Sequence, residues 1–275
     1  MGAYFELILF LLTIASGIIA LIDIVFFAKK RKAAIEATNP TIKKLSKKAY
    51  REATKGPWLA DYARSLFPVF FIVLLLRSFL GEPFRIPSGS MQPTLQIGDF
   101  ILVSRYDFGL KFPVWNWHLT ATKLPKRGDV VVLHFPVNTK VDFIKRVIGL
   151  PGDTISYVNK ELIINGQKMT QKYIGMAVDR TNFGTYMVKE YQEDLDGVKH
   201  LIYRLPSQPD YNFYNLKVPQ GYVFVMGDNR DLSDDSRYWG FVPLNDLVGR
   251  ARRVIFSWSS HSTDLRWHRL GEKIH

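Results

Sequence analysis

The sequence contains no cysteine, which excludes disulfide bridges and zinc sites built on thiolates. It also lacks a Gly-rich phosphate loop, an HExxH motif and carboxylates spaced as in a calcium loop. Its 6 histidines are scattered along the chain. His134 lies in the apolar run 130–135, which is more typical of a strand side chain than of a Ser/His dyad. We therefore expect neither a metal nor a cofactor.

Acidic residues are outnumbered, with 25 Asp and Glu against 37 Lys and Arg, so the formal charge is +12. Such an excess often indicates binding to nucleic acid. Residues 29–57, however, hold ten basic residues against Glu36 and Glu52, which accounts for +8 of that excess in one short segment. The remaining residues carry only +4, and we do not expect nucleic acid as a partner.

Two long apolar stretches flank this basic segment. The first runs from Leu7 to Ala28, 22 residues with Asp23 as the only charge, and the second runs from Tyr62 to Leu80. A helix of about 20 apolar residues crosses the hydrocarbon core of a bilayer. Buried helices of a large soluble protein are the alternative, but a strongly basic loop between the two stretches favours membrane spans.

The positive-inside rule places the basic loop in the cytoplasm. We therefore divide the chain into an N-terminal segment with the first span (1–28), a cytoplasmic loop (29–57), a second span (58–80) and a large extracytoplasmic domain (81–275).

The domain at 81–275 consists of short apolar runs separated by Gly, Pro, Asp and Asn, which is typical of a mainly β fold with antiparallel sheets. We expect turns at Val158-Asn159-Lys160 and Asn165-Gly166, and a less regular inserted subdomain at about 167–219. The expected strands are Phe100–Ser104, Asp129–Phe135, Phe143–Ile148, Thr154–Val158, Glu161–Ile164, Gly221–Met226 and Leu247–Trp258.

Three segments of this domain contain residues that can take part in catalysis or binding. Residues 87–95 hold two serines between glycine and prolines, which is typical of a loop and can also present a hydroxyl and its amide in a concave turn. Residues 142–153 place Lys145 in an apolar strand. An exposed lysine is the ordinary interpretation, but an inward-facing one loses hydration and can act as a neutral base. The composition of residues 227–243 indicates a polar loop, which could hold an ion-pair network or bind calcium.

The sequence at these segments resembles that of bacterial signal peptidase I, the membrane-bound Ser/Lys endopeptidase that removes signal peptides from exported proteins. The matching motifs are Ser-Gly-Ser-Met-x-Pro-Thr-Leu at 88–95, Phe-Ile-Lys-Arg-Val-Ile-Gly-Leu-Pro-Gly-Asp at 143–153 and Gly-Asp-Asn-Arg-Asp-x-Ser-x-Asp-Ser-Arg at 227–237. They occur in the family's order, and the two spans match as well. Residues 167–219 contribute little to the resemblance.

The resemblance implies a role for each matching residue. Ser90 is the nucleophile and Lys145 the general base, while the Ser90 amide and Ser88 Oγ form the oxyanion hole. Ser233 hydrogen-bonds the lysine, and Asp235 and Arg237 form a supporting ion pair. The substrate-binding pockets, which accept the small side chains of a small-x-small site, are lined by Phe84, Ile86, Met91, Leu95, Ile101, Val132, Phe143 and Ile144.

The same resemblance implies partners and a location. The substrates are signal-peptide-bearing preproteins delivered by the export machinery, and the enzyme is a monomer in the bacterial inner membrane with its catalytic domain on the periplasmic face. One assignment conflicts with strand geometry, because strict alternation puts Lys145 on the face of Phe143 and not of Ile144.

Two rival interpretations remain. A self-cleaving repressor would use the same dyad, although two spans and the lack of a helix-turn-helix argue against it. A membrane-anchored binding or scaffold protein would leave the serine and lysine incidental.

Overall fold

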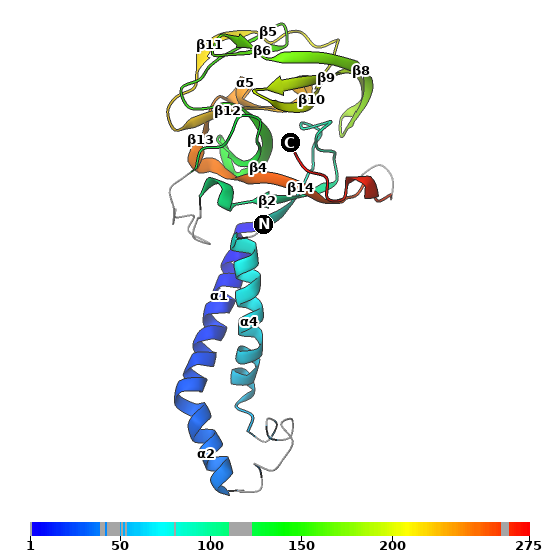
Figure 1. Cartoon of the computed structure of the whole chain (residues 1–275). Coiled ribbons are helices and arrows are strands. Elements are labelled where there is room, and N and C mark those ends of the chain that lie inside the picture. Colours follow the sequence, from blue (N-terminus) through cyan, green and yellow to red (C-terminus); the bar gives the residue numbers. More distant parts are fainter. Residues whose placement is uncertain are drawn as a thin grey trace. The chain divides into compact units, whose positions relative to one another are not determined.

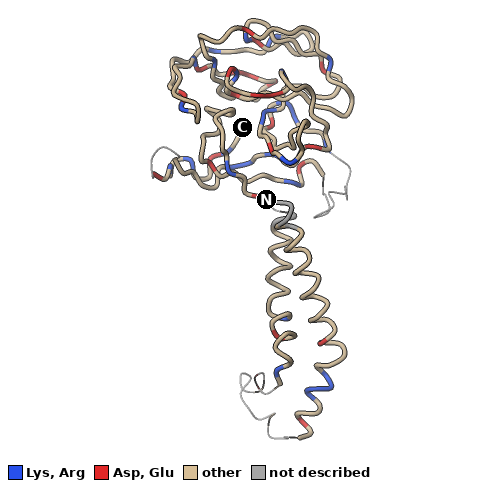
Figure 2. The backbone as a smooth tube through the Cα atoms, turned by 180° about the vertical axis from the view of Figure 1, so that it is seen from behind, with Lys and Arg blue, Asp and Glu red and all other residues tan. Residues whose placement is uncertain are grey.

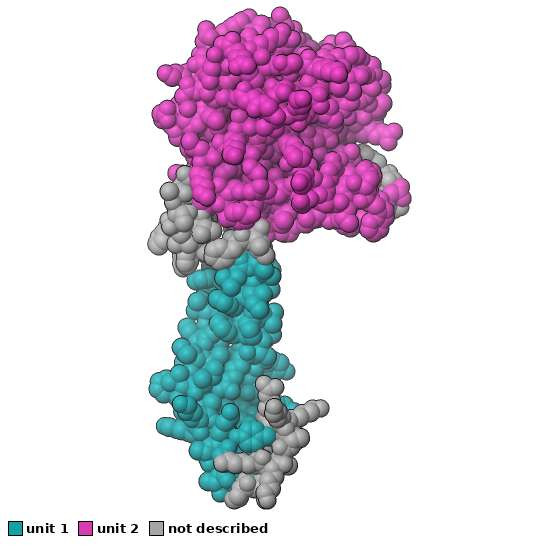
Figure 3. Space-filling model, viewed as in Figure 1, with its two compact units in different colours: residues 1–80, 111–117 teal, residues 81–110, 118–275 magenta. Residues whose placement is uncertain are grey.

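The structure is a computed structural model that describes residues 2–38, 42, 50, 52, 54–79, 81–109, 123–259 and 264–275. It divides into two compact units, one holding residues 1–80 and 111–117 and the other holding residues 81–110 and 118–275 (Figure 3). The first is helical and the second is built from antiparallel sheets (Figure 1).

The helical unit contains two helices long and apolar enough to cross a membrane, spanning Leu7–Thr38 and Trp58–Leu76. The first combines α1 (Gly2–Ile22), a π-helical segment η1 (Asp23–Ala28) and α2 (Lys29–Thr38), so the helix continues ten residues beyond the expected span. The second is α4 (Trp58–Phe79). Most of their apolar side chains face outward, which suits contact with lipid rather than with a protein core.

The charge inside the first span is paired. Asp23 accepts a hydrogen bond of 2.9 Å from Arg31 and contacts Arg64 of α4, as an ionisable group at membrane depth requires. Charged residues otherwise gather toward one end of the helices (Figure 2). The part of the expected cytoplasmic loop that contains Lys43, Lys44, Lys47, Lys48 and Arg51 lies outside the described residues.

The second unit confirms the expected mainly β, antiparallel fold. Its largest sheet has the order β1-β2-β14-β3-β4-β12-β13. These strands are β1 (Glu82–Arg85), β2 (Asp99–Ser104), β3 (Val130–Phe135), β4 (Asn138–Gly149), β12 (Tyr222–Met226), β13 (Val242–Pro243) and β14 (Leu247–Ser257). Strand β4 begins five residues before the expected strand at 143–148, and this extension reaches the site described below.

A second sheet has the order β11-β5-β6-β7. Its strands are β5 (Thr154–Val158), β6 (Glu161–Ile164), β7 (Gln167–Lys168) and β11 (Phe213–Lys217). Both expected turns form: Asn159 and Lys160 have φ of 51° and 63°, and Asn165 and Gly166 have φ of 52° and 80°. Such left-handed pairs match the twist of a hairpin.

The expectation of an irregular excursion at 167–219 is wrong. This region forms a regular three-stranded sheet from β8 (Thr170–Thr181), β9 (Gly184–Leu195) and β10 (Val198–Arg204). Its strand pattern is inverted: Ile174, Met176 and Val178 are about half exposed, while Asp179 and Glu193 are fully buried. Strand β8 therefore lacks an apolar inner face, although β9 and β10 bury Val188, Leu195 and Ile202. This mixed pattern explains why no strand was predicted here.

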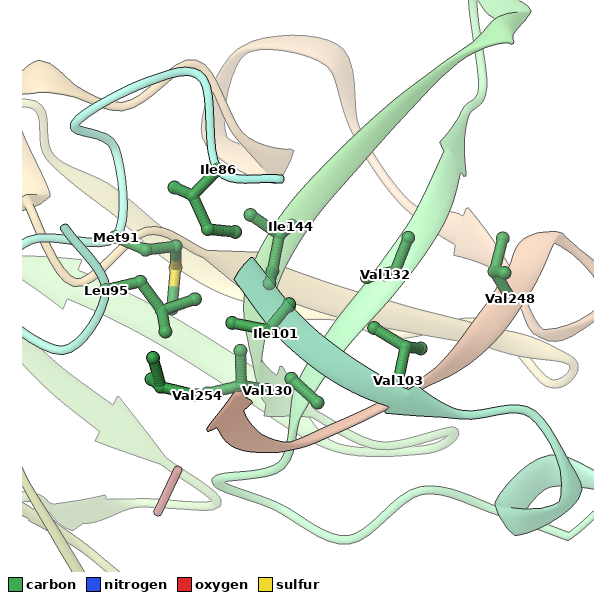
Figure 4. Packing of buried hydrophobic residues seen from close by; sticks show 11 residues of the cluster. Ile86, Met91, Leu95, Ile101, Val103, Val130, Val132, Ile144, Val248 and Val254 are labelled. Atoms are coloured by element: carbon green, nitrogen blue, oxygen red, sulfur yellow. The ribbon is translucent and has the colours of Figure 1, made fainter. Parts of the chain in front are cut away.

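Three apolar clusters fill this unit. One of them lies beneath the loop at 86–97 and joins β2, β3, β4 and β14 (Figure 4). It contains Ile86, Met91, Leu95, Ile101, Val103, Val130, Val132, Ile144, Val248, Ala251 and Val254. The cluster anchors that loop, because Met91 and Leu95 are completely buried in it.

Candidate functional site

The three chemistry-bearing segments meet around one cavity of about 530 Å³. The loop at 87–90, the β4 stretch from Val141 to Lys145 and the loop at 232–234 each contribute to its lining. The β8–β9 hairpin contributes Thr181, Asn182, Phe183 and Tyr186. Segments separated by more than fifty residues in the sequence are thus brought together at one place.

Ser90 and Lys145 are in direct contact, with 2.7 Å between Ser90 Oγ and Lys145 Nζ. Lys145 lies on β4 opposite Val131 of β3 and is only 4% exposed. Its Nζ lies 5.3 Å from the centre of the Phe143 ring. A serine hydroxyl and a buried amine at this separation can exchange a proton directly.

Burial lowers the pKa of Lys145 from 10.5 to about 8, because the ammonium form loses its hydration. Nearby carboxylates oppose this change, first Asp235 and then Asp234, and Arg237 adds to it. A base with this pKa is partly neutral near pH 7, which the ordinary lysine is not.

The loop at 87–90, which contains Ser90, is held by the polar loop that follows β12. Asn229 donates its backbone N–H to Ser90 O at 3.1 Å and its side-chain amide to Gly89 O at 3.1 Å. Gly227 permits this close approach, since a Cβ at that position would lie 2.4 Å from Ser90 O. Bonds to the carbonyls on both sides of the Ser90 amide fix the backbone without using that amide.

The hydrogen bond expected from Ser233 to Lys145 is absent. Ser233 Oγ is buried without a hydrogen-bond partner among the described residues. It lies against Gly227, where an added Cβ would come within 2.2 Å of it. The hydroxyl therefore packs on the glycine, while Lys145 bonds to Ser90.

The expected ion pair between Asp235 and Arg237 does form, with 2.8 Å between Oδ1 and Nε. Asp235 also accepts the Gly227 N–H at 2.9 Å and caps the short helix α5 (Ser236–Trp239). Burial acts to raise the pKa of Asp235, but Arg237 outweighs it and holds that pKa below its ordinary value. The pair thus braces the glycine that contacts Ser90.

Two further buried ion pairs were not predicted. Arg146 bonds Asp228 through Nε at 2.8 Å and Nη2 at 2.7 Å, and Arg230 bonds Glu193 of β9 at 2.8 Å. All four side chains are fully buried. Arg146, Asp228 and Arg230 lie within two of the motifs noted in the sequence, whereas Glu193 lies in no motif and could not be predicted.

Most of the eight predicted pocket residues do not line the cavity. Ile86, Met91, Leu95, Ile101 and Val132 are at most 2% exposed and form the cluster of Figure 4. Phe84 is half-buried and packs against that cluster. Of the set, Phe143 and Ile144 line this cavity and the others lie in or against the core cluster, so the assignment of these residues to substrate pockets stays a prediction.

Phe143 and Ile144 face different clusters, as alternation requires. Phe143 stacks on Phe135 at 4.5 Å and packs with the cluster around Val147, whereas Ile144 belongs to the cluster of Met91. Both border the cavity because β12 pairs with β4 only from Arg146 onward. Among the described residues, β4 before Arg146 pairs only with β3, so its other edge is open along the cavity.

Ser88 is exposed and borders the same cavity. The structure thus separates the site residues suggested by the sequence into a serine–lysine pair at the cavity, a buried ion pair and a group of core residues.

Comparisons with known proteins identify the family of this chain. A family model described as "Signal peptidase, peptidase S26" matches residues 59–258. Signal peptidase I of Pseudomonas fluorescens is 42% identical over 273 residues, covering 94% of each chain. That of Pseudomonas aeruginosa is 42% identical over 269 residues, covering 92% of each chain. A crystal structure of a signal peptidase I from Enterococcus faecalis V583 is 30% identical, covers 46% of this chain and 97% of its own, and has a TM-score of 0.32. The chain therefore belongs to the peptidase S26 family of signal peptidases.

Proposed function

We propose that this signal peptidase cleaves preproteins with a Ser90/Lys145 dyad, after a small-x-small site. The observation that carries the proposal is the 2.7 Å contact between Ser90 Oγ and the buried Lys145 amine. In the family's reaction the neutral lysine removes the serine proton while Oγ attacks the scissile carbonyl. Lys145 then returns that proton to the leaving amine, and a water molecule hydrolyses the acyl-enzyme with Lys145 again as base.

The tetrahedral intermediate carries negative charge on the former carbonyl oxygen. The Ser90 N–H and Ser88 Oγ are the donors we assign to it. Removing one donor of an oxyanion hole typically lowers kcat by about 10² to 10³. The bonds that Asn229 makes to Gly89 O and Ser90 O support this role, because they hold the Ser90 amide in a fixed place.

The substrate adds as an extended strand to the open edge of β4. Backbone hydrogen bonds of this kind supply affinity, and side-chain pockets supply selection. Residues −1 and −3 before the scissile bond project to one side of such a strand. We place them toward Ile144, which lines the cavity and belongs to the apolar cluster of Met91.

The test is cleavage of a purified preprotein in detergent, with the new N-terminus identified by mass spectrometry. Ser90→Ala and Lys145→Met should abolish cleavage and leave thermal unfolding cooperative. Ser207→Ala and Lys172→Met, at exposed positions outside the cavity, are matched controls that should retain it. Full activity in either dyad variant would overturn the mechanism.

We further propose that the chain is a monomer that spans the bacterial inner membrane twice, at residues 1–28 and 58–80. The +8 charge of residues 29–57 supports a cytoplasmic loop, which leaves residues 81–275 on the periplasmic side where the export machinery delivers preproteins. Protease added outside spheroplasts should degrade residues 81–275 and spare 29–57. Protection of the large domain would refute this orientation.

A further inference from the structure

The β8–β9 hairpin reaches the nucleophile loop, although residues 167–219 carry little of the family's motifs. In Figure 1 the hairpin curves toward the segment that precedes β2. Its Asn182 donates a side-chain hydrogen bond of 2.8 Å to Pro87 O. Gln92 donates one of 3.1 Å to Arg180 O. The tip of the hairpin is therefore attached on both sides of Ser90.

The hairpin is also held by the polar loop that follows β12. Buried Asp179 accepts a hydrogen bond of 2.7 Å from Asn229, the residue that also bonds Gly89 O. Farther along, Glu193 of β9 pairs with Arg230 of the same polar loop. A hairpin held in this way presents its tip at a defined place instead of sampling many positions.

Phe183 at that tip is 92% exposed and borders the cavity. It belongs to none of the three buried clusters. Tyr186, which is partly buried, borders the cavity from the same hairpin. A large aromatic side chain left in water on a braced tip, beside a reactive serine, is placed to contact a ligand in that cavity.

The geometry of an extended substrate indicates which of its residues Phe183 can contact. Side chains alternate along an extended strand, so residue −2 points away from the side occupied by −1 and −3. The small-x-small pattern leaves residue −2 unspecified. We propose that Phe183, supported by Tyr186, contacts the side chain at −2 and favours an apolar residue there. This inference rests on the proposed function, since it assumes a preprotein strand along β4.

Kinetics with two peptides test the preference. The peptides are identical small-x-small substrates that carry Leu or Ser at −2. Phe183→Ser should lower kcat/KM for the Leu peptide about tenfold and leave the Ser peptide unchanged. Met187→Ser is the matched control, because Met187 is an exposed apolar residue of the same hairpin that does not border the cavity. Equal effects of Phe183→Ser on both peptides would overturn the inference.

The lack of native cysteine permits a second test that does not depend on turnover. In the Ser90→Ala background, Phe183→Cys should form a disulfide with a peptide that carries Cys at −2 when a mild oxidant is added, and Met187→Cys should not. Absence of the link, equal linking by both variants, or linking only to a cysteine at another peptide position would overturn the assignment. Cleavage by Ser90→Ala itself would instead count against the proposed function.

Discussion

Protonation of Lys145 should set the lower pH limit of activity. Burial lowers the pKa of this lysine from 10.5 to about 8, a difference equivalent to about 3 kcal/mol. At pH 7 a lysine of pKa about 8 is roughly 9% neutral, against about 0.03% for one of pKa 10.5. The site thus raises the population of the active base about 300-fold.

The assay is kcat/KM against pH, measured for the detergent-solubilised enzyme with a soluble signal-sequence peptide. Because the neutral amine is the active form, kcat/KM should rise with pH through a single midpoint near 8 and then level off. Between pH 9 and pH 6 it should fall by about a hundredfold. A midpoint below 6, or a rise that continues above pH 10, would refute the argument from burial.

The same difference in pKa predicts how stability depends on pH. The folded chain binds fewer protons than the unfolded chain between about 8 and 10.5, so the free energy of unfolding should rise with pH across that window. Below about pH 8 the full cost of burying the lysine remains. Lys145→Met removes the group, so the stability difference between variant and wild type should change by about 3 kcal/mol between pH 7 and pH 10.5. A constant difference would contradict the assignment.

Two further predictions concern the carboxylates near the lysine. Asp234 is exposed and favours the ammonium form of Lys145. Asp234→Asn should therefore lower the pKa of the lysine and move the acid limb of the pH profile to lower pH, by a small amount because water screens the charge. Movement to higher pH would contradict this. Asp235→Asn should destabilise the protein by about 3–5 kcal/mol, because it leaves Arg237 buried and unpaired. Thermal unfolding measures the loss. Glu161→Gln, which breaks the exposed pair with Lys168, is the control and should cost less than about 1 kcal/mol; equal losses would refute the role of burial.

The sequence predicted the elements whose pattern follows simple rules. Strands β5 and β6 occur at the expected residues, since each is bounded by a turn whose residues tolerate positive φ. The two long helices were evident because an apolar stretch of that length has few alternatives. The position of Lys145 in an apolar strand made it a candidate base. Its contact with Ser90, however, depends on two chain segments 55 residues apart and on the register between β3 and β4.

Elsewhere, local pattern was a poor guide because the determining contacts are not local. Strands β8 and β9 expose Met176 and bury Asp179 and Glu193, because these two carboxylates pair with Asn229 and Arg230 in the loop after β12. The surroundings of the predicted pocket residues also depend on contacts between distant segments. Met91 and Leu95 follow Ser90 closely in the sequence, and Figure 4 shows them pointing into the core cluster.

The buried ion pairs around the dyad have an electrostatic consequence beyond holding the loops. Unpaired carboxylates near a lysine raise its pKa, because each one stabilises the ammonium form. They therefore oppose the loss of its proton near neutral pH. Asp228 and Asp235 both act on Lys145 in this direction, yet each is paired with a buried arginine, Arg146 or Arg237. The arginines therefore allow acidic groups to brace the nucleophile loop while much of their field at the amine is cancelled. Asp234, which also acts on Lys145 and borders the cavity, is exposed to solvent, where its field is screened. This distribution explains how a site rich in carboxylates keeps a lysine with a pKa of only about 8.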